Sequence, residues 1–243
     1  MGQDDQRTRW GPLRVGDCVL AVWTNRSAGD QRTLGTAQGV PEAVPPGLAV
    51  RRVNQLHGAD VVVDTPVSGS SCESGPARAG ARWPGADAIV SHDEGSCLAI
   101  LTADCAAVAL GSAEGVFGAV HVGWRGLVAG VVENAVGAMA DLGASDVSAG
   151  LGPCIHPCCY RFEAPELDLL AGRYGQDVRT VTAREEPALD LPLAVRRALT
   201  LAGARVTVDI DRCTACGDDT FSYRARQDEQ RQALLVWLDR AAR

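Results

Sequence analysis

Short runs of apolar and β-branched residues alternate with polar or glycine-rich turns along most of the chain. Runs of this length and composition are typical of strands buried in a sheet. The segments that we expect to form strands are residues 18–24, 47–53, 59–63, 86–90, 97–102, 116–122, 147–151, 206–210 and 234–238. The short connections favour mixed or antiparallel pairing, with residues 59–63 returning after residues 47–53.

Three other segments carry apolar residues at the spacing of a helix. The first begins after Gly126 and has Gly143 to end it, and its buried face would contain Leu127, Val131, Val132, Ala135, Val136, Met139 and Leu142. Residues 166–174 and 191–202 are also expected to be helical. The last helix has Asp190 as its N-terminal cap and Gly203 just past its end.

The chain has 243 residues, which is enough to bury a substantial core, and we expect a single domain over residues 1–243. Residues 65–84 are rich in Ser, Gly, Pro and Ala and contain Cys72. A stretch of this length without a strand or helix pattern is either a functional lid or an insertion. Its composition offers little to bury, so we predict a flexible insertion.

Composition excludes several classes of function. The net charge of −7 and the sequence pI of about 5.1 argue against nucleic-acid binding. No apolar run is long enough to span a bilayer, and residues 1–9 lack the apolar core of a signal peptide, so we expect a cytoplasmic protein with no membrane partner. The chain contains no lysine, which excludes Schiff-base chemistry and Walker-type phosphate loops.

Cys105, His121 and His57 suggest a metal site. Cys105 follows the apolar run 97–102, and His121 lies near the end of the run 116–122, so the two are expected to be neighbours. His57 precedes a glycine in a turn between two strand-like runs. Two imidazoles and a thiolate suit zinc, and three protein ligands leave a fourth position open for chemistry.

Three alternatives to a catalytic zinc site stay open. Each ligand candidate, taken singly, is more often a core residue. A blue-copper site would add a methionine, but the chain has only Met1 and Met139, and its four histidines are too few for a multicopper laccase. Copper is therefore the less favoured metal. A metal-free hydrolase would use Cys105 as the nucleophile and His121 as its base.

Charged residues near these positions are further candidates. Asp87 or Asp104 could orient a ligating imidazole or act as a general acid or base. A turn or cap role is somewhat favoured for Asp87, whereas Asp104, between an apolar strand and Cys105, is expected to need a partner. Arg125 stands at a predicted helix start and could hold a phosphate, or form a surface ion pair. Arg224 is the weaker candidate; the aromatic residues Phe221 and Tyr223 before it could stack on a base or pack in the core.

A second group of cysteines occurs in the C-terminal half, at Cys154, Cys158, Cys159, Cys213 and Cys216. The CxxC spacing in the second part of this group is found in structural zinc sites. Free buried thiols are the expected state of these cysteines, and a structural zinc site is the less favoured alternative. The choice between the two stays open at this point.

Several short motifs occur in one order along nearly the whole chain, and TADC and HxGWRG are the most specific of them. They are Gln55-Leu56-His57-Gly58, Ala86-Asp87-Ala88, Thr102-Ala103-Asp104-Cys105, His121-Val122-Gly123-Trp124-Arg125-Gly126, Gly152-Pro153-Cys154-Ile155, Cys213-Thr214 and Phe221-Ser222-Tyr223-Arg224. In these motifs the chain resembles the laccase-domain, or polyphenol oxidase, family, whose members are described as purine nucleoside phosphorylases and, in one branch, as a peptidoglycan editing factor.

The resemblance implies an α/β (α+β) fold, a layered αββα sandwich with mixed sheets related to certain cysteine hydrolases. It implies zinc on His57, Cys105 and His121, and phosphorolysis of adenosine, inosine and methylthioadenosine with adenosine deamination as a side activity. A non-enzymatic factor with a link to cell-wall synthesis is the remaining alternative. Departures from the family pattern, which leave the metal ligands untouched, occur at Ala107, Arg161 and residues 229–231.

On this basis we assign expected roles to individual residues. We expect Asp104, Cys105 and Arg125 to be catalytic. The purine nucleoside and inorganic phosphate are expected to contact Asn54, Asp87, Arg125 and Arg224.

Overall fold

The computed structural model describes residues 9–34, 44–65 and 83–242. The predicted insertion at residues 65–84 lies almost wholly outside these ranges, and so does Cys72. None of the described helices combines the length and the apolar character needed to cross a bilayer.

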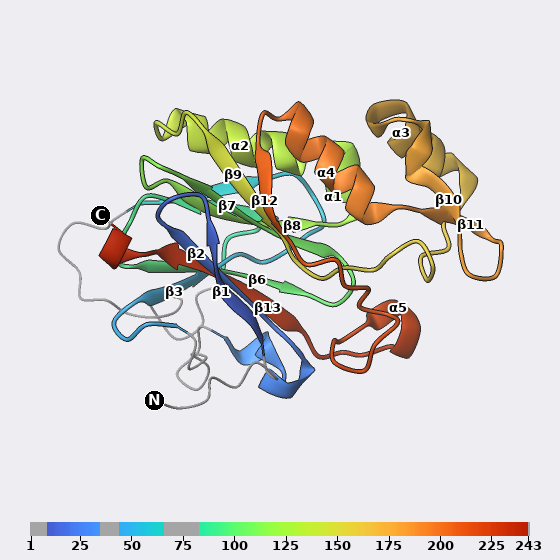
Figure 1. The fold of residues 1–243 in the computed structure, drawn as a ribbon, viewed down its shortest axis with the longest axis horizontal. Coiled ribbons are helices and arrows are strands. Elements are labelled where there is room, and N and C mark those ends of the chain that lie inside the picture. Colours follow the sequence, from blue (N-terminus) through green and yellow to red (C-terminus); the bar gives the residue numbers. More distant parts are fainter. Residues whose placement is uncertain (1–8, 35–43, 66–82, 243) are drawn as a thin grey trace.

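Two mixed sheets lie one on the other (Figure 1). The five-stranded sheet has the order β1 (Arg9–Val15), β2 (Val19–Thr24), β13 (Gln232–Leu238), β6 (Ser96–Thr102) and β3 (Ala49–Arg52). The six-stranded sheet has the order β12 (Arg205–Asp209), β9 (Val147–Leu151), β7 (Ala106–Ser112), β8 (Phe117–Val122), β5 (Ala88–Ser91) and β4 (Val61–Asp64). The pairs β3–β6, β4–β5 and β9–β12 are parallel and the others antiparallel, which confirms the expected mixed α/β class.

The helices α1 (Trp124–Ala129), α2 (Val131–Asp141), α3 (Ala164–Tyr174) and α4 (Leu191–Leu201) gather on one side of the two sheets, whereas the short α5 (Tyr223–Arg226) lies apart from them (Figure 1). Single 3-10 turns cover Arg26–Ala28, Gln31–Thr33, Gln176–Val178 and Arg240–Ala242, and a small hairpin joins β10 (Arg179–Val181) to β11 (Pro187–Leu189). In the described part of the chain, the outer face of the five-stranded sheet is covered by the side chains of Leu34, Val44 and Leu48 and not by an α-helix.

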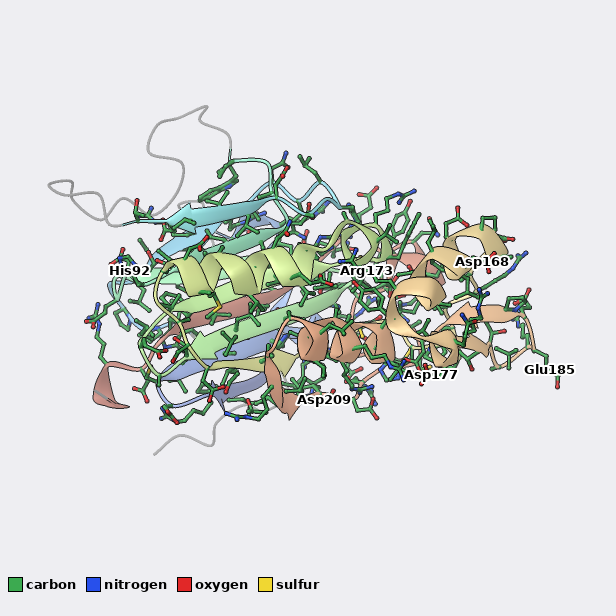
Figure 2. The ribbon with its side chains drawn as sticks, turned by 90° about the horizontal axis from the view of Figure 1, so that it is seen from above. His92, Asp168, Arg173, Asp177, Glu185 and Asp209 are labelled. Atoms are coloured by element: carbon green, nitrogen blue, oxygen red, sulfur yellow. The ribbon has the colours of Figure 1, made fainter. Side chains whose placement is uncertain are left out.

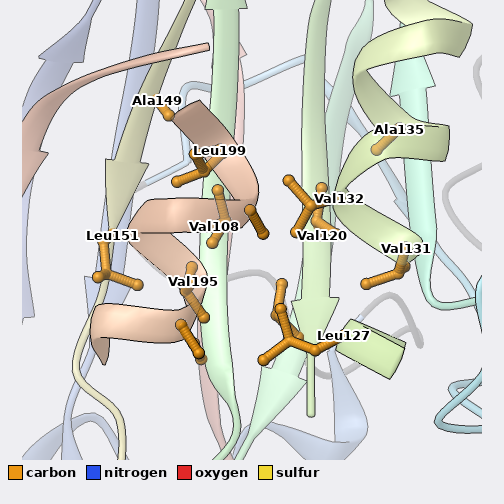
Figure 3. Close-up of a cluster of buried hydrophobic side chains, with 14 of the residues drawn as sticks. Val108, Val120, Leu127, Val131, Val132, Ala135, Ala149, Leu151, Val195 and Leu199 are labelled. Atoms are coloured by element: carbon orange, nitrogen blue, oxygen red, sulfur yellow. The ribbon is translucent and has the colours of Figure 1, made fainter. Parts of the chain in front are cut away.

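The largest core cluster lies between the six-stranded sheet and α1, α2 and α4 (Figure 3). Strands β7 and β8 contribute Val108 and Val120, and the helices above them contribute Leu127, Val132 and Val195. Arg173 connects α3 to α1 and α2. Its guanidinium donates to the Val128 carbonyl of α1 and to the Glu133 carboxylate of α2 (Figure 2). The helical layer therefore covers the face opposite the inter-sheet core.

Trp23 links the two sheets across that inter-sheet core. Its indole, on β2 of the five-stranded sheet, is buried, and its Nε1–H donates to the Ala107 carbonyl of β7 at 3.0 Å. The ring needs glycines opposite it: a Cβ at Gly152 would lie 2.0 Å from Nε1, and one at Gly150 would lie 2.9 Å from Cη2. A polar contact and close packing thus fix the spacing of the sheets at one point.

The sequence patterns missed strands β1, β7, β10 and β11 and misjudged one connection. The runs 97–102 and 116–122 are not consecutive strands, because β7 lies between them and is buried throughout. Residues 59–63 do not return beside residues 47–53; β3 joins the five-stranded sheet and β4 the six-stranded one. The prediction of a hairpin there was wrong because periodicity carries no information on which sheet receives a strand.

The helix expected after Gly126 is broken at Gly130. This residue has a φ of 89°, ends α1 and begins α2. A left-handed backbone at this position suits glycine, since other residues adopt it at a cost. The expected cap of Asp190 is confirmed, with its carboxylate accepting the Leu193 N–H at 2.9 Å.

We predict that Trp23→Phe lowers the free energy of unfolding by about 2–4 kcal/mol, because it removes the inter-sheet hydrogen bond and leaves a void. Chemical denaturation of the variant measures this loss. Trp237→Phe is the matched control, since Trp237 is also buried but packs on the outer face of the same sheet. Equal losses in the two variants would contradict the role given to the inter-sheet contact.

Candidate metal-binding and catalytic site

His57, Cys105 and His121 lie together at one end of the two sheets. Their ligand atoms are all within 4.8 Å of one another, and the two imidazole rings meet edge to face with their centroids 4.8 Å apart. The register of β7 and β8 explains part of this, because Ala107 pairs with His121 and Cys105 stands just before β7. The expected proximity of Cys105 and His121 is therefore observed.

Two of these residues occupy connections between the sheets. His57 lies between β3 of the five-stranded sheet and β4 of the six-stranded sheet. Cys105 lies between β6 and β7, which belong to the same two sheets in the same order. Because β3 and β6 are parallel neighbours, both connections leave the five-stranded sheet at the same end.

Asp87 fixes the geometry of both histidines. Its carboxylate is buried and accepts the backbone N–H groups of Leu56, His57 and Gly58 at 3.1, 2.9 and 2.6 Å. The same carboxylate lies 2.8 Å from Nδ1 of His121. Burial by itself raises the pKa of Asp87, but the hydrogen bonds from His121 and from the backbone outweigh it and hold the pKa below its ordinary value.

Glycines next to the histidines make the close approach possible. A Cβ at Gly123 would lie 3.1 Å from the Cys105 sulfur and 3.3 Å from Cδ2 of His57, and one at Gly126 would lie 3.0 Å from the Gly58 carbonyl. The backbone of His57 itself has a φ of 61°, which a non-glycine residue adopts only at some cost. The three amides held by Asp87 offset that strain.

The Cys105 thiol and the His121 imidazole form a charge pair. Burial by itself raises the pKa of Cys105. The opposite charge of His121 and hydrogen bonds from both histidines outweigh burial and lower this pKa to about 6. Burial likewise lowers the pKa of His121, while the Cys105 charge and the Asp87 carboxylate raise it to about 9. The thiolate is therefore the form of Cys105 near neutral pH.

These three residues form a suitable donor set for a divalent metal. Asp87 engages Nδ1 of His121, which leaves Nε2 as the ring nitrogen available to an ion. Gly123 has no side chain, and this leaves space between the Cys105 sulfur and the His57 ring that a Cβ would enter. The set does not match a copper centre of the kind considered from the sequence, since Met139 is packed in the core and, in the described part of the chain, His92 and His156 lie outside this group.

Asp104 connects the C-terminal segments that contain Thr214 and Arg224 to the same site. Its backbone φ is 99°, and its buried carboxylate accepts the Thr214 hydroxyl at 2.7 Å and the Arg224 backbone N–H at 2.6 Å. The carboxylate expected to need a partner thus has two. Thr214 was not among the predicted site residues, although it stands in one of the motifs, and nothing in the sequence indicated its contact with Asp104.

A pocket of about 570 Å³ opens beside His57, Cys105 and His121. Among the described residues, its lining contains five arginines and only one carboxylate, Asp104, and the arginines are Arg32, Arg52, Arg125, Arg224 and Arg231. Such an excess of positive charge favours an anionic ligand.

Within the described ranges, four of the five pocket arginines have no carboxylate partner, and two of these, Arg52 and Arg231, donate to backbone carbonyls instead. Arg125, the second residue of α1, lies over the Trp124 ring at 4.4 Å, and Arg224 lies over Tyr160 at 5.1 Å. No hydrogen bond of the Arg125 guanidinium is seen within the described residues, and Arg224 gives one N–H to the Arg161 carbonyl at 3.3 Å, so both retain donors for a ligand. The surface ion pair considered for Arg125 is not seen in the described part of the chain.

The other predicted contact residues differ in their surroundings. Asn54 is exposed and lines the pocket. Asp87 is absent from the pocket lining, and its carboxylate accepts hydrogen bonds from the protein itself. Phe221 is buried beneath the Arg26 guanidinium, and Tyr223 is 53% exposed at the pocket. Gln55, unassigned from the sequence, binds both backbone groups of Leu101 and so anchors the His57 loop to β6.

Comparison with known proteins supports a common family. The profile of the family described as multi-copper polyphenol oxidoreductase laccase matches residues 14–239. A protein of Streptomyces griseus named purine nucleoside phosphorylase is 40% identical over 230 residues, covering 93% of this chain and 85% of that protein. One of the same name from Streptomyces coelicolor is 37% identical over 230 residues, covering 93% and 86%.

Solved structures agree with the fold. A Neisseria meningitidis protein superposes with a TM-score of 0.72 at 26% identity, covering 96% of this chain and 98% of its own. The YlmD protein of Geobacillus stearothermophilus superposes with a TM-score of 0.74 at 23% identity, covering 97% and 98%. The two layered mixed sheets are thus shared over nearly the whole length.

We predict that Asp87→Asn lowers the free energy of unfolding by about 2–3 kcal/mol at neutral pH, because an amide replaces an acceptor surrounded by N–H donors. The pKa of Asp87 lies below its ordinary value of 3.8, so its stabilisation is complete well above pH 3.8 and is lost as the pH falls through the lower folded value. Denaturant unfolding at several pH values measures both effects.

Asp60→Asn is the control for that experiment, since Asp60 is an exposed carboxylate in the same loop. A stability difference between Asp87→Asn and the parent protein that stays constant into strong acid would contradict the role of the carboxylate.

Proposed function

The chain belongs to the multi-copper polyphenol oxidoreductase laccase family, and on this premise we propose that it is a zinc-dependent purine nucleoside phosphorylase. The observation that carries the proposal is the pairing of an open three-ligand site with an arginine-lined pocket. The names of the relatives in Streptomyces favour the same reaction.

His57, Cys105 and His121 would hold the zinc ion. Two imidazoles and one thiolate leave a coordination position free, as in catalytic zinc sites. The bound ion supplies positive charge that polarises an oxygen atom of substrate or water. Asp87 keeps the His121 ring in the required orientation, and the Gln55 side chain holds the loop that carries His57 against β6.

Arg125 and Arg224 would hold inorganic phosphate. Both line the pocket, and within the described residues neither is neutralised by a carboxylate. A guanidinium can donate two parallel N–H groups to phosphate oxygens. The Trp124 and Tyr160 rings beneath them restrict their movement, so less side-chain entropy is lost on binding.

The purine nucleoside would occupy the rest of the pocket. A volume of about 570 Å³ lies in the usual range for small-molecule sites. Tyr223 presents an exposed ring on which a base can stack, and the exposed Asn54 amide can reach sugar or base polar atoms. Asp87, by contrast, would act through the positions of the two histidines rather than by contact with substrate.

The reaction itself would be a displacement at the anomeric carbon of the ribose. An oxygen of hydrogen phosphate forms a bond to C1′ while the bond from C1′ to the purine nitrogen breaks, and the departing base takes up the proton that the phosphate gives up. Holding phosphate and nucleoside together converts a bimolecular reaction into one within a complex. Asp104 and Cys105 stand at the pocket wall, where Asp104 fixes the backbone of Arg224.

Inosine, adenosine and methylthioadenosine are the proposed substrates, with adenosine deamination as a side activity of the same site. Deamination requires water in place of phosphate, attacking the purine C6. A phosphate-independent conversion of adenosine to inosine by the purified protein would support it. No role as a cell-wall factor is needed for either activity.

We predict that the protein converts inosine and phosphate to hypoxanthine and ribose 1-phosphate, as followed by chromatography. Arg125→Gln should raise KM for phosphate by about 10–100-fold, because a charge-assisted contact worth about 1.5–3 kcal/mol is lost. Arg205→Gln serves as the control, since Arg205 lies on the surface against Asp146 and does not line the pocket. No hypoxanthine from protein carrying stoichiometric zinc would contradict the proposal.

A metal-free thiol hydrolase is the second candidate, favoured by one observation. His121 lowers the pKa of Cys105 to about 6, so the sulfur is a competent nucleophile at neutral pH. Such an enzyme would use Cys105 to attack an acyl carbon, with His121 returning a proton to the leaving group.

Removal of zinc separates the two candidates. We predict that dialysis against a chelator abolishes phosphorolysis and that added zinc restores it, both followed by hypoxanthine release. Alkylation of Cys105 by iodoacetamide, mapped by mass spectrometry, should be slow in the zinc-loaded protein and fast after chelation. Activity that survives chelation but is lost on alkylation would favour the hydrolase.

A further inference from the structure

Four cysteine sulfurs form a cluster away from the three-ligand site. Cys158 and Cys159 come from the segment after β9, and Cys213 and Cys216 from the segment after β12. All four sulfurs lie within 4.8 Å of one another. Cys154, which the sequence grouped with them, is outside this cluster and is buried in the large hydrophobic core.

The spacing of the sulfurs is that of a tetrahedron around one ion. Cys216 lies 3.4 Å from both Cys158 and Cys159, and Cys158 lies 3.7 Å from Cys159 and 3.9 Å from Cys213. A zinc–sulfur bond of about 2.3 Å gives a tetrahedron with edges of about 3.8 Å. A disulfide would require about 2.05 Å between two of the sulfurs.

The local backbone explains how adjacent cysteines can face one centre. The chain turns at this point, since the Cys159 N–H donates to the His156 carbonyl and the Tyr160 N–H to the Pro157 carbonyl. On the other segment, Cys213 and Cys216 have the CxxC spacing that places two thiolates on one ion in many structural sites. A backbone bridge between Cys154 and Cys213 holds the two segments side by side.

The surroundings of the cluster suit thiolates. The backbone N–H of His156 donates to the Cys213 sulfur at 3.4 Å, a contact that stabilises negative charge on a ligand. Arg212 precedes Cys213 and is held by Asp219 at 2.9 Å. Its guanidinium offsets part of the net negative charge that four thiolates and one divalent ion would carry.

We propose that Cys158, Cys159, Cys213 and Cys216 bind one zinc ion in a closed, structural site, separate from the site of His57, Cys105 and His121. Four protein ligands leave no open position, so this ion takes no part in a reaction. It joins two segments that are more than 50 residues apart in sequence, as the separation of 55 between Cys158 and Cys213 shows.

The proposed ion would stabilise one wall of the pocket. Thr214, next to Cys213, donates its hydroxyl to Asp104, and Tyr160, next to Cys159, lies beneath Arg224. Both contacts depend on the two cysteine segments keeping their relative positions. The ion therefore acts on the positions of Asp104 and Arg224 through the backbone and does not contact substrate.

The test is the zinc content of protein purified with zinc present, measured by elemental analysis per folded chain. We expect two zinc ions in the parent protein, one in Cys159→Ser/Cys216→Ser, and one in His57→Ala. Cys216 is exposed and Cys159 only partly buried, so their replacement disturbs the core less than replacement of the buried Cys213 would. The control is Cys97→Ala, which removes a buried thiol belonging to neither site and should retain both ions.

A second measurement counts the thiolates without relying on activity. Cobalt substituted into His57→Ala reports on the cysteine cluster, because cobalt–thiolate charge-transfer absorption grows with the number of bound sulfurs. We expect the intensity of a four-sulfur site, falling by about half in the same chain carrying Cys159→Ser and Cys216→Ser.

Two results would overturn the proposal. The first is a zinc content that the Cys159→Ser/Cys216→Ser change leaves unaltered. The second is a disulfide among these cysteines, seen as a mass lower by two hydrogens in the unreduced, denatured chain, because an oxidised pair cannot bind the ion. Loss of the His57 site alone would bear on the proposed function and leave this cluster unaffected.

Discussion

The buried carboxylate of Asp87 is the interaction on which the site depends. An isolated charge in the interior would cost several kcal/mol, but four N–H groups surround this one, three from the backbone of residues 56–58 and one from His121. The same contacts hold His57 in a left-handed backbone conformation and set the tautomer of His121. One side chain thereby determines the position of both imidazoles relative to Cys105.

Around this carboxylate, the residues that form the core and the residues that line the pocket belong to different parts of the fold. The six-stranded sheet and its helices supply a rigid base through the cluster of Val108, Val120 and Leu127. His57 and Cys105 lie on connections and His121 near the end of β8, all at one end of the sheets, and the arginines of the pocket come from both the N-terminal and the C-terminal parts of the chain. Substrate preference can therefore change in the connections without change to the core.

Sequence patterns predicted most of the strands and the grouping of His57, Cys105 and His121, for identifiable reasons. Continuous apolar runs mark β6 and β8, and the histidines and Cys105 stand beside glycine or aspartate at strand ends. Strand β7 was missed because it opens with two alanines directly after the TADC motif and carries a glycine near its end. Contacts such as Thr214 to Asp104 and Arg224 to Asp104 join residues 110 and 120 positions apart, which no local pattern can reveal.

The two connections that carry His57 and Cys105 each pass from one sheet to the other, so neither reaches its final course before the sheets have stacked. A chain still being synthesised or refolded presents these donors singly, and single donors retain divalent ions poorly. If the site binds a divalent ion as proposed, the three donors can hold it together only after the sheets have stacked.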